Sequence, residues 1–391
     1  MRILNICAYT WAIGGPARII YDHAGVAVQR GHQVDILSPM SPGDDLYPAP
    51  AGVRVIPVLR TPPISRVFRE YSAPLYQFLK AHIHEYDIVH CHGIWHFGSL
   101  APFLLDKSVT KVVTIHGLLD KWAIRHSYWK KKLLTIVLQK RILNQANLIQ
   151  INNTDEQGDL LRYLGHQHPN VVIIPNGIPM ADFEVLPLPG TFRKQHGIPA
   201  KQPLILFMSR LNIKKGLDLL LPAFRQYAER HPDALLVLAG PDDGYQAATE
   251  AFVRDNNLTG RVKLVGMLID DAKKAALADA DVFVLPSYSE GFSMAVLEAM
   301  ASGTPTIVSD RVGFGEVIRE TGAACLTDLS AEGVLACLEK VLHNDDYREQ
   351  IRTTGQALVR ERYDIQVVAD QLLAAYQATM KQRRVTSTVV V

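Results

Sequence analysis

The side chains best suited to chemistry are two glutamates that flank the start of a predicted helix. Glu290 and Glu298 lie in the stretch PSYSEGFSMAVLEAM, residues 286–300, which follows an apolar strand-like run. Gly291 permits a tight turn, so the backbone N–H groups after it are expected at a helix N-terminus, where they and the helix dipole bind an anion or a polyol. Carboxylates at this place accept hydrogen bonds from sugar or ribose hydroxyls. The alternative is a capped helix with two solvated acids.

A second group supplies two cations in a similar setting. Arg210 and Lys215 lie in FMSRLNIKKG, residues 207–216, again between a predicted strand and a predicted helix. This pair suits a diphosphate, because arginine binds it through a bidentate fork and lysine as a point charge. The alternative is a set of exposed surface charges, of which Lys214 is expected to be the most exposed.

Two weaker signals follow other strands. Gly14 and Gly15 come after the first strand and allow the backbone to approach a phosphate or sugar closely. Their spacing is not G-x-G-x-x-G, so the fingerprint of a nicotinamide dinucleotide site is absent and a dehydrogenase is disfavoured. His116 ends a strand, where it either faces a cleft or is a satisfied loop histidine.

Two further patterns resemble metal sites, and we do not interpret either as one. His90, His92 and His96 are close in sequence, but they would form only half of a site with no visible partner. Asp279 and Asp281 match the D-x-D string of metal-dependent sugar transferases, yet they directly precede an apolar strand. We interpret this string as a helix-to-strand turn and expect no metal or other cofactor.

Short apolar runs and helical stretches must position these residues. They alternate along the whole chain, which predicts an α/β fold with crossover helices and parallel sheets. The predicted strands are 2–8, 33–38, 53–58, 88–91, 111–115, 148–151, 171–174, 203–208, 235–239, 261–265, 282–285 and 306–308. The predicted helices include 17–30, 129–147, 155–164 (with a capping box from Thr154 to Gln157), 216–230, 295–301 and 365–381, followed by a frayed tail at 383–391.

The length of 391 residues favours two domains. A Pro-rich link at 179–189 follows the last strand of the first alternating set, so we place the boundary near Asn176. Ligands in doubly wound sheets bind at the carboxyl ends of strands, where the residues above are expected.

The composition excludes several classes of protein. A net charge of +2 argues against a general nucleic-acid binder. The four cysteines, Cys7, Cys91, Cys325 and Cys337, show no metal spacing and are expected to be buried in a reducing compartment. Neither a secretory leader nor a membrane-spanning run is visible, so we expect a cytoplasmic protein.

Together these motifs resemble glycosyltransferase family 4, the retaining nucleotide-sugar-dependent enzymes of the GT-B fold. The resemblance rests on Glu290 and Glu298 with seven residues between them, on Arg210 and Lys215, and on the Pro-Asn-Gly turn at 175–177. It implies two Rossmann-like doubly wound domains with an interdomain cleft. Residues 1–176 would form the acceptor side, 177–364 the donor domain, and a final helix at about 365–385 would pack back on the first domain.

The resemblance also implies roles for the matched positions. Arg210 and Lys215 would hold the donor diphosphate and stabilise the departing nucleotide. Glu298 would bind the ribose, Glu290 the donor sugar, and His116 would lie near the reacting carbon. The catalytic residues implied are His116, Arg210, Lys215 and Glu290. The donor-binding residues implied are Gly14, Gly15, Arg210, Lys215, Met267, Glu290, Gly291, Phe292, Ser293, Met294, Ala295 and Glu298.

The implied reaction moves a hexose-type sugar from a nucleotide-diphosphate sugar, most simply a UDP- or GDP-sugar, to a sugar or lipid-linked acceptor of surface-polysaccharide assembly. A same-face attack would give retention, with the leaving phosphate accepting the proton. Rival interpretations are a nucleotide-sugar epimerase of the same fold and a non-catalytic nucleotide-sugar-binding protein.

Residues 111–150 differ in charge from the rest of the chain. They contain eight Lys or Arg residues against one acid, interleaved with aromatic and apolar residues. Such a segment either docks on an anionic membrane, which predicts a peripheral protein on the inner membrane face, or packs as a basic helix on the first sheet.

Overall fold

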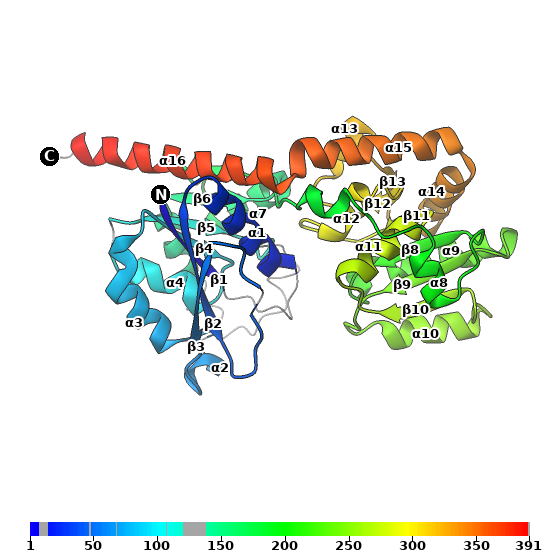
Figure 1. The fold of residues 1–391 in the computed structure, drawn as a ribbon, viewed down its shortest axis with the longest axis horizontal. Coiled ribbons are helices and arrows are strands. Elements are labelled where there is room, and N and C mark those ends of the chain that lie inside the picture. The colour runs from blue at the N-terminus through cyan, green and yellow to red at the C-terminus, as the bar shows by residue number, and fades with distance from the viewer. Residues whose placement is uncertain (8–14, 47, 68, 107, 120–137, 390–391) are drawn as a thin grey trace. The chain divides into compact units, whose positions relative to one another are not determined.

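The computed structural model describes the chain except for residues 8–14, 47, 68, 107, 120–137 and 390–391 (Figure 1). The chain forms two compact units, one of Met1–Gly177 with Ile365–Val391 and one of Ile178–Asp364. Gly14 and residues 120–137 of the basic segment at 111–150 lie outside the described residues.

The first unit contains a parallel sheet of seven strands in the order β3-β2-β1-β4-β5-β6-β7. Its strands are β1 (Arg2–Cys7), β2 (Gln33–Met40), β3 (Arg54–Leu59), β4 (Ile88–His92), β5 (Thr110–Thr114), β6 (Leu148–Ile151) and β7 (Val171–Ile173). Each lies close to a predicted strand. Strands β4, β5 and β6 are buried along their whole length, because helices cover both faces of a parallel sheet.

Helices surround this sheet (Figure 1). They are α1 (Gly15–Gln29), α2 (Ile64–Val67), α3 (Ala73–His82), α4 (Phe97–Leu100), α7 (Thr154–Leu164) and α16 (Ile365–Val389), with short turns η2 (Ile83–Glu85) and η3 (Ala101–Leu104). The described part of the predicted 129–147 helix is helical from 138 to 145. The capping box at Thr154 was wrong, since Asn153 caps α7 by accepting the N–H of Glu156.

The final helix α16 packs against α1 in the same unit. Val26 of α1 is buried with Ile365 and Ala369 of α16, and Arg30 forms a bidentate pair with Asp370 at 2.8 and 2.9 Å. Helix α16 continues to Val389, so the part of the predicted frayed tail from 383 to 389 is helical; residues 390–391 of that prediction lie outside the described residues.

The second unit contains a parallel sheet of six strands in the order β10-β9-β8-β11-β12-β13. They are β8 (Leu204–Met208), β9 (Leu235–Ala239), β10 (Val262–Gly266), β11 (Val282–Leu285), β12 (Thr306–Ser309) and β13 (Cys325–Thr327), the last of which was not predicted. The helices and turns are η4 (Met180–Phe183), α8 (Thr191–His196), η5 (Ile213–Lys215), α9 (Leu217–Arg230), α10 (Gln246–Asp255), α11 (Asp270–Asp279), α12 (Met294–Ala301), α13 (Gly315–Thr321), α14 (Ala331–His343), α15 (Asp345–Leu358) and η6 (Val359–Tyr363).

All four cysteines are buried, as expected. In the described part of the chain, the helices are too short or too polar to cross a membrane. Lys111 does not belong to a basic surface, because it is buried in β5 and its Nζ donates to the backbone oxygen of Asp106 at 2.5 Å.

Candidate active site

The sheet of the second unit changes winding direction between β8 and β11. These two strands are neighbours, but β9 and β10 continue on one side while β12 and β13 continue on the other. Ligands of doubly wound sheets bind at such a switch point, beyond the carboxyl ends of the strands. Arg210 and Lys215 follow β8, and Glu290 and Glu298 follow β11, so all four predicted side chains come from loops or helices that start at this point.

Gly216 allows the loops after β8 and β11 to approach each other. Its φ is 74°, in the left-handed region, and a Cβ there would lie 2.0 Å from the backbone oxygen of Pro286. Only glycine fits this contact without a shift of the backbone. The approach lets the Lys215 ammonium form an ion pair with Glu290, and both side chains are largely buried, with exposed fractions of 11% and 13%.

The second carboxylate is also paired with a lysine. Glu298 lies in the second turn of α12, as predicted, and its Oε1 accepts a hydrogen bond from Lys273 Nζ of α11 at 2.5 Å. These side chains are only 12% and 15% exposed. Lys273 was not predicted, because nothing in the run DDAKK distinguishes it from Lys274, which pairs with the exposed Asp271.

Arg210 is the exposed member of the cationic pair. Its side chain is 63% exposed, and its Nη1 donates to Asp243 Oδ2 at 2.5 Å. Lys214 is half-buried, so the expectation that it would be the most exposed cation was wrong. Asp243 was not predicted as the partner of Arg210. The adjacent Asp242 accepts the N–H of Gln246, the first residue of α10, at 3.0 Å.

Helix α12 begins between Glu290 and Glu298 in the sequence. Ser293 is the N-cap residue and makes no side-chain capping hydrogen bond. The first turn, beginning with Met294 and Ala295, therefore presents helix N-terminal amides, which suit an anion or hydroxyl groups. The Phe292 ring fixes this end of the helix, because its centroid lies 5.2 Å from that of Phe314 and 5.8 Å from that of Tyr363.

Other predicted positions lie elsewhere on the same unit. Met267 follows β10, two strands from the switch point, and is 61% exposed. Asp279 accepts the N–H groups of Gly190 and Arg193 at 2.6 and 3.0 Å, and Asp281 accepts the N–H of Leu204 at 2.7 Å. The D-x-D string is therefore the helix-to-strand turn that we expected.

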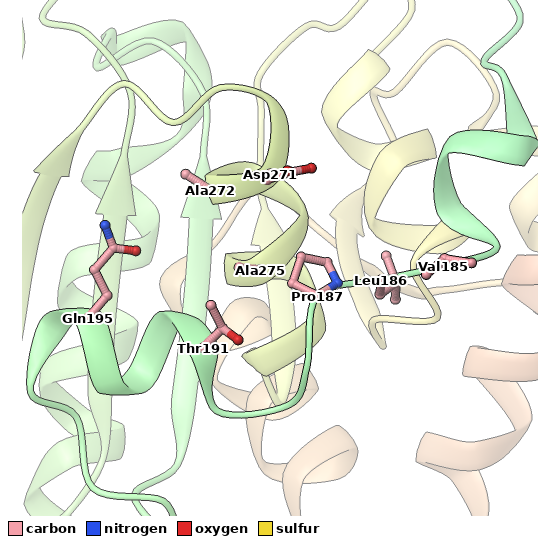
Figure 2. Close-up of a pocket in the computed structure, with 8 residues that line it drawn as sticks. All are labelled: Val185, Leu186, Pro187, Thr191, Gln195, Asp271, Ala272 and Ala275. Carbon is pink, nitrogen blue, oxygen red and sulfur yellow. The ribbon is translucent and has the colours of Figure 1, made fainter.

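A surface hollow of about 470 Å³ lies between α11 and the segment around α8 (Figure 2). Its walls include the apolar side chains of Val185, Leu186 and Pro187. Within the described chain, none of the predicted site residues lines this hollow. Its apolar lining lacks the paired charges of the switch point, so we do not assign it to the donor.

In the first unit, His116 is the second residue after the end of β5 and follows Ile115. It has a φ of 54°, a strained value for a residue with a side chain. Its Nε2 lies 3.4 Å from Nδ1 of His92, which ends β4. Burial lowers the pKa of His116 to about 4, so the imidazole is neutral near neutral pH. Gly15 is the first residue of α1.

The neighbouring histidines form a hydrogen-bond network. His90 contacts the Tyr376 hydroxyl through Nδ1 at 2.5 Å and the Thr114 hydroxyl through Nε2 at 2.6 Å. His92 Nε2 lies 3.0 Å from Asn5 Oδ1. Hydrogen bonding within the unit therefore accounts for both nitrogens of His90.

A buried glutamate supports the loop that carries His116. Glu156 accepts hydrogen bonds from the backbone and side-chain N–H groups of Asn152 at 2.9 and 3.1 Å and from the backbone of Gly117, while burial raises its pKa. Glu156 was not predicted as a functional residue, because in sequence it is an ordinary glutamate in the first turn of a helix.

The buried histidines predict a loss of stability in acid. Burial lowers the pKa values of His23, His96 and His116 to about 4, below the ordinary 6.5. Protonation of these histidines is thus disfavoured in the folded protein. Their full contribution to the free energy of unfolding is present above about pH 6.5, and the free energy of unfolding falls as the pH drops toward 4. Urea unfolding at about pH 7 and about pH 5 measures this. His23→Gln should reduce the pH dependence, whereas the exposed His84→Gln should not; equal slopes for both would contradict the prediction.

Two family models of known proteins match the chain. The sequence model described as Glycosyltransferase Family 4 matches residues 13–182, and that described as Glycosyl transferases group 1 matches residues 190–358. A phosphatidyl-myo-inositol mannosyltransferase of Mycobacterium tuberculosis is 28% identical over 391 residues, covering 96% of this chain and 97% of the relative.

Solved structures support the same fold. Sucrose-phosphate synthase from Thermosynechococcus elongatus matches with a TM-score of 0.80 and 21% identity, over 98% of this chain and 100% of the other. HepE from Anabaena, solved in complex with UDP-glucose, matches with a TM-score of 0.75 and 19% identity, over 97% and 100%. The chain therefore belongs to glycosyltransferase family 4 and is a glycosyltransferase of the GT-B fold.

Proposed function

We propose that the chain transfers a hexose from a UDP- or GDP-sugar to an acceptor hydroxyl with retention of the anomeric configuration. The donor is assigned to the unit Ile178–Asp364 and the acceptor side to the unit that carries His116. The observation that carries this proposal is the pairing of two lysines with two glutamates where β8 and β11 end.

The ion pairs fit a ligand that carries both phosphates and hydroxyls. Each cation of the site, Arg210, Lys215 and Lys273, faces a carboxylate. A nucleotide-sugar can replace both halves of such a pair, since its phosphates bind the cations and its hydroxyls donate to the carboxylates. Binding can therefore proceed without leaving a buried charge unpaired, which would be costly.

The roles follow from these contacts. Arg210 and Lys215 bind the diphosphate and stabilise the negative charge that develops on it, together with the amides at the start of α12. Glu298 accepts hydrogen bonds from the ribose and Glu290 from the sugar. His116 belongs to the acceptor side of the proposal, and its neutral imidazole adds no positive charge there.

The transfer step needs no metal in this proposal. The bond between the anomeric carbon and the phosphate oxygen breaks, and the acceptor oxygen forms the new bond on the same face. The acceptor proton passes to the leaving phosphate. Lys215 and Arg210 supply the counter-charge, and the D-x-D carboxylates are engaged by backbone N–H groups.

The acceptor is proposed to be lipid-linked or part of a surface polysaccharide. The relative from Mycobacterium tuberculosis is named for phosphatidyl-myo-inositol. The sequence of residues 111–150 adds basic and aromatic residues suited to an anionic lipid surface. The enzyme is accordingly proposed to act at the inner face of the membrane.

The test is a panel of UDP-, GDP-, ADP- and dTDP-sugars. Calorimetry measures which donor binds, and nucleotide release is followed with vesicles that contain or lack phosphatidylinositol. We expect one preferred donor, slow release without acceptor, and a glycosylated lipid identified by mass spectrometry. Binding of no donor would overturn the proposal, and isomerisation of the donor sugar without acceptor would identify an epimerase instead.

A further inference from the structure

Three side chains with metal-binding atoms converge at the edge of the second unit opposite the donor residues. His231 directly follows α9, while Glu339 and His343 lie on α14. One ligand atom from each lies within 4.8 Å of the others. These residues were not predicted as a group, because 108 residues separate His231 from Glu339.

The arrangement is held by the two helices. Glu339 and His343 are four residues apart, which places them on one face of α14. Oε2 of Glu339 lies 3.2 Å from Nε2 of His231 and 3.6 Å from Nε2 of His343. The two imidazole rings are stacked, with centroids 4.5 Å apart. The three groups therefore need only small movements to share one ion.

The surrounding contacts orient the ligand atoms of Glu339 and His343. Arg230 donates to Oε1 of Glu339 at 3.1 Å, so the other oxygen faces the imidazoles. The Tyr227 hydroxyl lies 3.1 Å from Nε2 of His343. Either neutral tautomer of His343 has one unprotonated ring nitrogen, and an ion bound at Nε2 would take the place of the Tyr227 hydroxyl there.

We propose that His231, Glu339 and His343 bind a divalent cation of the late first transition row, with Zn²⁺ as the ion to test. Two imidazole nitrogens and one carboxylate oxygen are ligands that Zn²⁺ prefers, and a water completes a tetrahedral site. The competing arrangement is a hydrogen-bonded network in which Glu339 accepts from an imidazole and no ion binds.

This site is separate from the donor residues. Helix α9 begins after Gly216 at the switch point and ends before His231, and its 14 residues span about 21 Å. An ion held between His231 and α14 would brace these helices without touching the donor. The inference is thus independent of the proposed function, and its effect should appear as stability.

The experiment uses the full chain without a polyhistidine tag, after removal of metals with a chelator. Zn²⁺ is titrated by calorimetry, thermal unfolding is followed with and without Zn²⁺, and Co²⁺ is used to detect tetrahedral coordination by its visible absorption. We expect one ion per chain, a rise in Tm of several degrees, and an affinity at least about tenfold weaker for either His343→Gln or Glu339→Gln.

The matched control is His166→Gln, which changes an exposed histidine of the other unit. It should bind Zn²⁺ like the wild type. Two ligand variants are used because both sites are partly exposed, at 48% and 29% of their side chains, so at least one is expected to fold normally by circular dichroism. Absence of Zn²⁺ binding by the wild type, or wild-type affinity in a folded ligand variant, would overturn the inference.

Discussion

Lys215→Ala is expected to lower kcat/KM for donor turnover by at least about a hundredfold. Lys215 is the largely buried cation at the switch point, and its ammonium faces Glu290. The substitution removes the charge that would stabilise the leaving diphosphate, and it leaves the Glu290 carboxylate to repel that diphosphate. Steady-state release of nucleotide and calorimetric donor binding measure the two parts of the effect.

Lys214→Ala is the matched control, because it removes the same charge one residue away. It should retain donor affinity and kcat/KM to within a few-fold. The double variant Lys215→Ala/Glu290→Gln removes the repulsive carboxylate and should recover part of the lost donor affinity, but not the rate. Equal effects of Lys214→Ala and Lys215→Ala would mean that general surface charge, and not the site, binds the donor.

Much of the donor region was predictable, because parallel strands are short and apolar and the loops that follow them carry the ligand-binding residues. The runs at 203–208 and 282–285 predicted β8 and β11, and the residues after them lie at one edge by the geometry of a parallel sheet. The sequence predicted that Gly216 ends the loop after β8. The structure adds that the absence of a side chain there permits a close contact with the Pro286 backbone.

The partners of the site residues were not predictable in the same way. Lys273 and Asp243 come from neighbouring loops and helices, and their pairing with Glu298 and Arg210 depends on strand order. A sequence pattern reports which face of a helix is apolar but not which residue of another helix lies opposite.

Local signals failed where tertiary contacts competed with them. Lys111 was counted with a basic surface, but β5 is a buried central strand and the lysine reaches the Asp106 backbone. The end of α16 was expected to fray, yet helix persists to Val389. Strand β13 has three residues and gives too short an apolar run for a periodicity argument.

Glu298→Gln is expected to weaken donor binding by about tenfold or more and to lower the free energy of unfolding by about 3 kcal/mol. The glutamine keeps the shape of the side chain but removes the charge that hydroxyl groups would donate to. It also leaves the ammonium of Lys273, whose side chain is 15% exposed, without its carboxylate. Calorimetry with the preferred donor and urea unfolding measure the two losses separately.

The double variant Glu298→Gln/Lys273→Gln separates these two losses. It removes the unpaired charge, so the stability should return toward that of the wild type, because the cost arises from leaving one partner of a buried pair. Donor affinity should stay low, since the carboxylate is still absent.

Lys274→Gln is the control for Lys273. Lys274 pairs with Asp271, whose side chain is 86% exposed, so losing this pair should not change the stability measurably. If the double variant regained both stability and donor affinity, Glu298 would act only as the counter-ion of Lys273, and the ribose contact would have to be assigned to another residue.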